Sequence, residues 1–158
     1  MPTSQPHAEH PERTLLRGIH ELARSDVPVA TNPLAGALNM RIAAVPEFGH
    51  VVISYDIGEQ FAQGDGIVQG GICATMLDFG LAFAAMSAVP SGRTVSTIGL
   101  NVNYLRPGQL GKFTVDGQVE KMGRTVAVAR ASLMDEAGRL IATASSPLAV
   151  IPFHPPAT

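Results

Sequence analysis

The chain has 158 residues, of which 46% are hydrophobic and 15% are charged, a composition typical of one globular domain and not of a disordered chain. With 11 Lys and Arg against 13 Asp and Glu, the formal net charge is -2, so no overall basic excess is present to attract nucleic acid or an anionic membrane. The single cysteine excludes an intramolecular disulfide and a site built from several thiolates, and it is typical of a reducing, cytoplasmic setting.

The N-terminal part of the sequence predicts a tail followed by a helix. Residues 1–11 are polar, contain prolines and lack the apolar run of a secretory signal, so we expect a disordered tail. Residues 12–24 carry apolar side chains at helical spacing and predict a short amphipathic helix. A loop with prolines completes an N-terminal segment, 12–36. We expect the main domain to span 37–152 and a second tail to follow at 153–158.

Two strands and one long apolar helix are predicted at the start of the main domain. Residues 38–42 and 50–55 alternate between apolar and polar side chains, which is typical of strands. A glycine-rich stretch, 60–71, leads into an apolar helix at 72–88. That helix approaches the length of a membrane span, but Asp78 near its middle opposes burial in lipid. We therefore predict a helix buried inside the domain.

After the helix the apolar period changes from 3.6 to 2, and four strands are predicted, at 94–105, 113–121, 124–134 and 139–150. Short connections favour antiparallel neighbours. In the first of these strands one face is expected to carry Ile98, Leu100, Val102 and Tyr104. Because a helix that is apolar nearly all round must be enclosed, we predict an α+β fold in which an antiparallel sheet of about six strands curls around one central helix.

The central helix has two unlike faces. The large side chains form one stripe at 100° per residue and are expected to press into the sheet; they are Ile72, Met76, Phe79, Phe83 and Met86. Asp78 lies on a second face, among small residues that allow another backbone to approach closely. We therefore expect its carboxylate to point toward a seam, such as one made with a second chain.

The glycines before the helix suggest a place for a polarised carbonyl. Gly70 and Gly71 leave free backbone N–H groups at the positive end of the helix, two turns before Asp78. Such donors and a carboxylate can together hold a carbonyl and a base or nucleophile. The alternative interpretation is that Asp78 is a structural or solvated carboxylate without a chemical role.

Other kinds of site find little support in the sequence. The histidines are scattered and none has metal-ligand spacing, so no metal is expected. The phosphate-binding patterns GxxxxGK[ST] and GxGxxG and the nucleophile pattern GxSxG are all missing. Cys73, on the first turn of the helix, is interpreted as a packed small hydrophobe and not as a reactive thiol.

The segment from Gln63 to Asp78, with Gly70-Gly71 inside it, resembles the active-site segment of hotdog-fold acyl-CoA thioesterases. It is most similar to the PaaI-like branch of the 4-hydroxybenzoyl-CoA thioesterase superfamily, and the likeness extends over residues 38–151. The resemblance implies a hotdog fold and the hydrolysis of acyl-CoA thioesters to a free acid and CoA. CoA is then part of the substrate, and no separate cofactor is implied.

The same resemblance implies roles for five residues. Asp78 stands at the acidic position that acts as nucleophile or general base, and Gly70 at the glycine whose N–H polarises the thioester carbonyl. Gln63 matches the residue that orients the carbonyl or water, and Ser96 falls where some relatives hold the attacking water. Gln69 occupies the position where the family has histidine; glutamine can still hydrogen-bond but cannot titrate near neutrality.

The resemblance also implies a substrate surface and an assembly. Contacts to the CoA substrate are expected from Gly71, Asn103, Arg106, Gly123 and Arg124. In the family each site is shared between two subunits, so Gln63, Gln69 and Gly70 of one chain would face Asp78 and Ser96 of the other. A homodimer is therefore expected, and a homotetramer is implied as a pair of dimers. Neither nucleic acid nor a membrane is expected as a partner.

Two alternative functions stay open at this point. A hotdog domain that binds acyl-CoA without turnover is suggested by glutamine at position 69. A hotdog hydratase or dehydratase needs a histidine paired with an acid in its site, and Gln69 counts against it.

Overall fold

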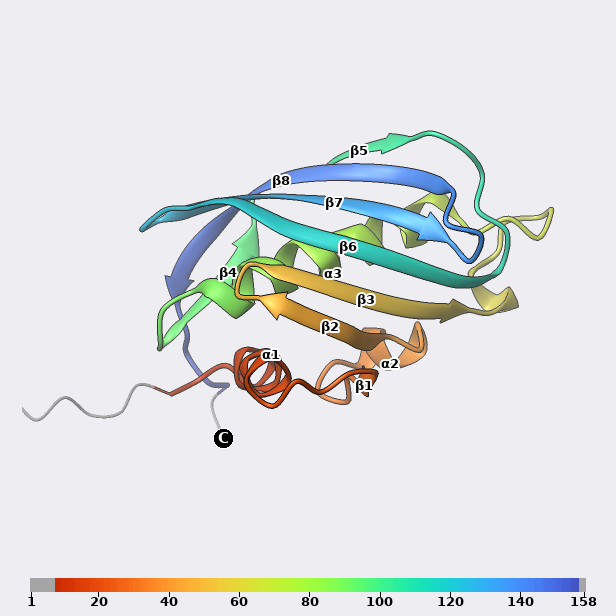
Figure 1. Cartoon of the computed structure of the whole chain (residues 1–158). Helices are drawn as coiled ribbons and strands as arrows, with labels where there is room; N and C mark the ends of the chain where they lie inside the picture. The colour runs from red at the N-terminus through yellow and green to blue at the C-terminus, as the bar shows by residue number, and fades with distance from the viewer. Residues whose placement is uncertain (1–7, 157–158) are drawn as a thin grey trace, which may run out of the picture.

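One long helix lies along the concave face of a curled antiparallel sheet in the computed structural model, which describes residues 8–156 (Figure 1). The sheet order is β1-β2-β3-β6-β7-β8-β4, and β5 also pairs with β8. The strands are β1 (Val27–Pro28), β2 (Arg41–Glu47), β3 (His50–Ile57), β4 (Arg93–Thr97), β5 (Asn101–Tyr104), β6 (Gly111–Met122), β7 (Val126–Asp135) and β8 (Leu140–Pro152). The helices are α1 (Pro11–Glu21), α2 (Pro33–Ala37) and α3 (Gly70–Ala88), with a 3-10 turn at Glu59–Phe61. The predicted α+β arrangement around a central helix is confirmed.

The sheet has eight strands where about six were predicted, chiefly because the expected strand 94–105 is broken in two. Between β4 and β5 the ladder is interrupted: the Ile98 N–H donates to the Pro147 carbonyl at 3.0 Å, and the Ser146 hydroxyl donates to the Gly99 carbonyl at 2.6 Å. The remaining strand, β1, is two residues long and pairs with the start of β2.

The break shifts the alternation of side chains by one residue. Thr97 pairs with buried Leu148, and Val102 pairs with buried Ala144, so both face the helix although they are five residues apart. The prediction that Ile98 shares a face with Val102 is therefore wrong, and Ile98 is 60% exposed. The extra residue in the irregular segment is the physical reason.

The N-terminal segment is fastened to the loop that follows α3. The helix α1 begins at Pro11, one residue before its predicted start, where the His10 ring accepts a hydrogen bond from the Glu12 N–H at 3.2 Å. The Glu9 carboxylate accepts hydrogen bonds from the Ser91 hydroxyl and, at 3.2 Å, from the Gly92 N–H. Of the two predicted tails, residues 1–7 and 157–158 lie outside the described residues.

A second short helix, α2, lies within the segment that was expected to be a loop. The Asn32 carboxamide oxygen accepts hydrogen bonds from the N–H groups of Leu34 and Ala35 at 3.0 and 3.3 Å, and Pro33 occupies the first helical position. An Asn cap followed by proline is a common start of a helix. It places Asn32 and Leu34 beside the central helix, where both line a pocket with Asp78.

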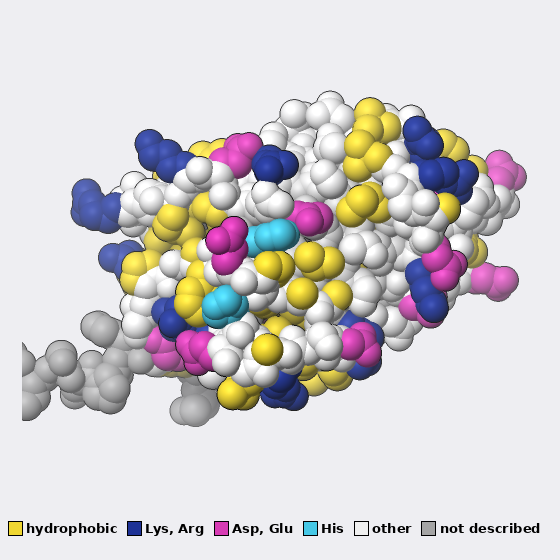
Figure 2. Space-filling model, in the orientation of Figure 1, with side chains coloured by type: hydrophobic (Ala, Val, Ile, Leu, Met, Phe, Trp, Pro, Cys, Tyr) yellow, Lys and Arg dark blue, Asp and Glu magenta, His cyan; other side chains and the backbone are white. Residues whose placement is uncertain are grey.

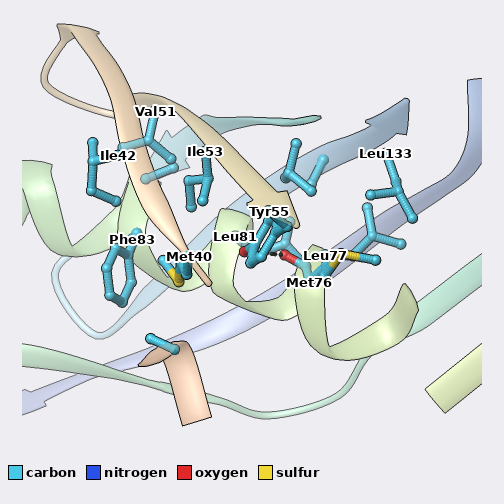
Figure 3. Packing of buried hydrophobic residues seen from close by; sticks show 14 of the residues in the cluster. Met40, Ile42, Val51, Ile53, Tyr55, Met76, Leu77, Leu81, Phe83 and Leu133 are labelled. Atoms are coloured by element: carbon cyan, nitrogen blue, oxygen red, sulfur yellow. Dashed lines mark hydrogen bonds between the residues drawn. The ribbon is translucent and has the colours of Figure 1, made fainter. Parts of the chain in front are cut away.

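The residues of α3 that are buried differ in part from the predicted stripe of large side chains. Met76, Phe83 and Met86 are buried as expected, but Ile72 and Phe79 are only partly buried. Leu77 and Leu81 are also fully buried against the sheet. Figure 3 shows them beside Tyr55 and Leu133. Although α3 is long and apolar enough to suit a membrane span, its buried side faces the sheet here, as predicted.

Helix and sheet approach each other most closely at Gly80 and Gly117. A Cβ atom on Gly117 would overlap the backbone of Gly80, and a Cβ on Gly80 would overlap the Val115 side chain. Backbone atoms cannot turn aside as a flexible side chain can, so a methyl group at 117 would force the helix away from β6.

We therefore predict that Gly117→Ala lowers the free energy of unfolding by about 1–3 kcal/mol or more through overpacking. Gly18→Ala is the matched control, because Gly18 lies within α1 with no atom within 4 Å of the added Cβ. That change should leave stability unchanged or raise it by up to about 1 kcal/mol. Urea unfolding followed by circular dichroism measures both, and equal stabilities of the two variants would contradict the prediction.

Candidate active site

Asp78 lies on the side of α3 that the sheet leaves partly uncovered. One of its carboxylate oxygens accepts a hydrogen bond from the Thr97 hydroxyl of β4 at 2.8 Å. No ion pair formed within residues 8–156 involves Asp78. The carboxylate is thus oriented by a neutral donor and keeps its charge uncompensated by a neighbouring cation.

A pocket of about 240 Å³ opens beside this carboxylate. Polar side chains from four elements line it: Glu12 of α1, with His10 before it, Asn32 of the α2 cap, Thr75 of the same helix and Thr94 of β4. Its apolar wall comes from Phe79, Ala82, Phe83, Met86 and Val95. A small apolar pocket next to a carboxylate can hold the organic part of a substrate.

Tyr55 of β3 packs against the buried side of α3 near Asp78. Its hydroxyl donates to the Met76 carbonyl at 3.2 Å. Burial and the nearby negative charge of Asp78 together raise the pKa of the Tyr55 phenol well above its usual range. Tyr55 is therefore a neutral structural donor, and the ionisable group facing the pocket from this part of the helix is Asp78.

A second pocket, of about 580 Å³, lies at the N-terminus of α3. The N–H groups of Gly70 and Gly71 donate no hydrogen bond to any group in residues 8–156. They stand at the positive end of the helix dipole, where such donors attract a partly negative oxygen. The Gln69 side chain does not cap the helix, so both N–H groups stay available.

The loop before α3 folds back on itself and carries the two glutamines to this pocket. Its closing bonds run from the Gln63 N–H to the Ile67 carbonyl at 2.8 Å and from the Gln69 N–H to the Phe61 carbonyl at 2.9 Å. The turn between them uses Gly66 at φ +70°, a left-handed conformation that favours glycine. Gln63 and Gln69 are both exposed at the rim.

The structure gathers five of the residues predicted for the site around this second pocket: Gln63, Gln69, Gly70, Gly71 and Arg106. It does not bring Asp78 to them within one chain. Asp78 is eight residues beyond Gly70 on the same helix, which corresponds to roughly 12 Å along the axis, and it lines the other pocket. A thioester carbonyl bound by the Gly70 N–H would therefore lie out of reach of Asp78 in the same chain, so a carboxylate acting on it would have to come from another chain.

Ser96, which was predicted at the site, does not face Asp78. Its strand partner is the partly exposed Ala149, whereas Thr97 pairs with buried Leu148. Thr97 is therefore the β4 residue that contacts the carboxylate, and Ser96 points to the opposite face of the sheet. Ser96 was assigned to the site through the resemblance alone, and no local pattern in the sequence singled out Thr97.

Three other predicted contact residues also lie away from both pockets. Asn103 pairs with Thr143 on β8, and its alternation with Val102 and Tyr104 turns its side chain away from the helix. Gly123 and Arg124 belong to the β6–β7 hairpin, at the end of the sheet opposite the N-terminus of α3 (Figure 1).

A further pocket of about 680 Å³, whose lining includes Asn39, Arg41 and Asp135, contains none of the residues predicted for the site. Basic and acidic side chains are intermixed on the face shown in Figure 2. Across residues 8–156, no group of three His, Cys, Asp or Glu side chains is arranged to hold a metal ion.

Residues 65–142 match a protein family described as the thioesterase superfamily. A candidate esterase of Halobacterium salinarum is 43% identical over 76 residues, and YigI of Escherichia coli, a medium/long-chain acyl-CoA thioesterase, is 33% identical over 93 residues. These alignments cover 47% and 51% of this chain. They cover 50% and 60% of the lengths of these two relatives.

Among solved structures, a candidate thioesterase of Ralstonia eutropha JMP134, related to phenylacetic acid degradation, is similar in both fold and sequence. It superimposes with a TM-score of 0.74 at 31% identity, over 89% of this chain and 99% of that one. The likeness thus extends over most of this chain and nearly all of the other.

Cys73 provides a test of the pocket at the N-terminus of α3. Its side chain is 3% exposed, and burial raises the pKa of the thiol. We predict that the native protein reacts with a disulfide reagent such as DTNB roughly tenfold or more slowly than the urea-unfolded chain at neutral pH, because less thiolate is present and access is limited. Equal rates in the two states would contradict this placement of Cys73.

Proposed function

This chain belongs to the thioesterase superfamily, and on that premise we propose that it hydrolyses acyl-CoA thioesters to a free acid and CoA. The observation that carries the proposal is the combination of a carboxylate held by one neutral donor with two free helix N–H groups in a chain of this family. The name of the bacterial relative YigI supports acyl-CoA as the substrate class.

In the proposed reaction the thioester carbonyl oxygen accepts hydrogen bonds from the Gly70 and Gly71 N–H groups, which stabilise the negative charge that develops on it. The Asp78 oxygen not held by Thr97 either takes a proton from an attacking water or attacks the carbonyl carbon itself. The C–S bond then breaks, and CoA leaves as a thiolate that takes up a proton. If water was the nucleophile, the free acid has formed at this point; if Asp78 attacked, a water molecule then hydrolyses the acyl–Asp78 anhydride to release the acid and restore the carboxylate. Gln63 and Gln69 orient the carbonyl or water at the rim of the pocket.

We further propose that two chains complete each site. The strands β4 and β5 pair only with β8, which leaves their outer edge free in the described chain. Exposed apolar side chains lie along it, at Ile98, Leu100, Tyr104 and Leu105. An exposed apolar edge favours pairing with another strand, and a two-fold axis there would set Gln63, Gln69 and Gly70 of one chain opposite Asp78 of the other.

The rest of the predicted assembly belongs to this proposal. A two-fold pairing would also turn the β6–β7 hairpin of one chain toward the Gly70 pocket of its partner, so that Arg124 and Arg106 both serve the phosphates of CoA. We extend the proposal to a tetramer of two such dimers and to a cytoplasmic location.

We expect Asp78→Asn to lower kcat for thiol release by about 10²–10⁴-fold, the range typical of a lost general base. Thr97→Val, which removes the donor to Asp78, should lower kcat less, by about tenfold. Ser96→Ala is the matched control and should keep the parent rate. Release of CoA from acetyl-, hexanoyl-, palmitoyl- and phenylacetyl-CoA measures all three, with circular dichroism as the folding check.

The outcomes distinguish the candidate functions. Unchanged turnover by Asp78→Asn would refute the proposed role of the carboxylate. Saturable binding of acyl-CoA by the parent protein without thiol release would refute the hydrolase and favour the non-catalytic domain.

The shared site has a separate test, which uses Gly70→Pro. Proline removes the N–H donor, but it suits the first position of a helix, and Gln69 already has the extended conformation that proline requires of its predecessor. Gly70→Pro and Asp78→Asn should each be inactive alone. In a heterodimer one site combines intact Gly70 with intact Asp78, so we expect about half the parent activity per dimer.

Two differently tagged variants, co-expressed and purified in tandem, supply that heterodimer. A heterodimer without activity would show that each site is formed within one chain.

A further inference from the structure

Tyr104 holds the first peptide unit of the central helix. Its hydroxyl donates a hydrogen bond to the Gly70 carbonyl at 2.7 Å. Its ring atoms lie 3.6 Å from the point where a Cβ on Gly70 would stand, so the ring packs directly on this glycine. Tyr104 comes from β5, so this contact joins the start of α3 to the free edge of the sheet.

This bond acts on a group that already has a partner within the helix. In an α-helix the carbonyl of the first residue accepts from the N–H four residues on, so the Tyr104 hydroxyl takes the second lone pair of the Gly70 oxygen. The bond is therefore not needed to satisfy a buried atom. Tyr104 is also 54% exposed, so its side chain contributes little to the packing of the core.

The geometry of the peptide bond carries the effect to the donor. The Gly70 carbonyl and the Gly71 N–H belong to one planar unit, so a hydrogen bond to the oxygen fixes the direction of the N–H and strengthens it as a donor. The next peptide is held in the same way, because the Thr75 hydroxyl donates to the Gly71 carbonyl at 2.8 Å. The Gly71 N–H thus lies between two fixed carbonyls.

We infer that Tyr104 is a positioning residue, which aims the Gly71 N–H at the carbonyl oxygen of the bound thioester. This inference rests on the proposed function, in which that N–H shares the developing negative charge with the N–H of Gly70. A preorganised donor stabilises the transition state more than the ground state, so Tyr104 acts on kcat and not on the binding of CoA.

The chain contains a matched control. It has two tyrosines, and both hydroxyls donate to carbonyls of α3, Tyr104 to Gly70 and Tyr55 to Met76. Tyr55 is buried, with 2% of its surface exposed, and the Met76 carbonyl that it contacts lies nearly two turns beyond Gly70 on α3. Removal of its hydroxyl takes the same kind of bond from the same helix without touching the Gly71 peptide.

The test compares Tyr104→Phe with Tyr55→Phe. We expect Tyr104→Phe to lower kcat by about three- to tenfold, with KM within twofold of the parent and an unchanged urea midpoint. Tyr55→Phe should keep the parent kcat and lower the urea midpoint, because it loses a buried bond. Parent-like kcat in Tyr104→Phe, or equal losses of kcat in both variants, would overturn the inference.

A binding measurement separates this inference from the proposed hydrolysis. The probe is a trifluoromethyl ketone joined to the sulfur of CoA through a methylene, which releases no thiol and whose hydrated carbonyl resembles the tetrahedral intermediate. If the parent protein binds it but releases no thiol from any acyl-CoA, the hydrolase proposal fails. The inference then stands if Tyr104→Phe weakens binding of the analogue by about three- to tenfold and Tyr55→Phe does not, and it falls if both variants bind like the parent.

Discussion

The contact between α3 and β6 at Gly80 and Gly117 governs the rest of this structure. Because neither residue has a side chain, two backbones meet there, and the distance between helix and sheet has little freedom. A helix held this closely cannot roll without clashes, so the rotation that buries Leu77 and Leu81 is fixed. The same rotation turns Asp78 away from the sheet core and toward the partly uncovered side. The position of the carboxylate therefore follows from two glycines that take no part in the chemistry.

The uneven cover of the helix explains why the proposed site has two parts. The sheet encloses the middle of α3, while the first turn and the Asp78 face remain open to separate pockets. Residues on one rigid helix cannot approach each other, so the separation between the Gly70 N–H and the Asp78 carboxylate is permanent within a chain. The proposed mechanism, which uses both kinds of group on one substrate, therefore includes a second copy of the chain. The free edge formed by β4 and β5 borders both pockets, because Tyr104 of β5 lines one and Thr94 and Val95 of β4 line the other.

The sequence predicted those parts of the fold that depend on periodicity. The apolar helix and the change to a period of 2 after it are local patterns, and the structure contains both. The prediction of a face of small residues around Asp78 is wrong, because Phe79, Phe83 and Met86 line the pocket beside the carboxylate and Ala85 is fully buried. Ser96 was assigned to the site through the resemblance alone, and the structure places Thr97 there. The wrong face predicted for Ile98 arose from the irregular segment 98–100, where hydrogen bonds with β8 decide the alternation of side chains. No local pattern in the chain signals such a bond in advance. The short helix α2 was missed for a different reason, since its Asn32-Pro33 start is also typical of a turn.

The glutamine at position 69 agrees with the chemistry of a thioester better than with that of an oxygen ester or a hydration. A thiol leaves with a pKa of about 8.5, so the departing sulfur needs little help from an acid, and a titrating histidine is dispensable at that step. Polarisation of the carbonyl comes from backbone N–H groups, whose strength depends on helix geometry and not on protonation. The one ionisable group that the proposed mechanism requires is then Asp78. A hydratase would have to protonate carbon as well as activate water, and Gln69 cannot supply the histidine that such a site pairs with its acid.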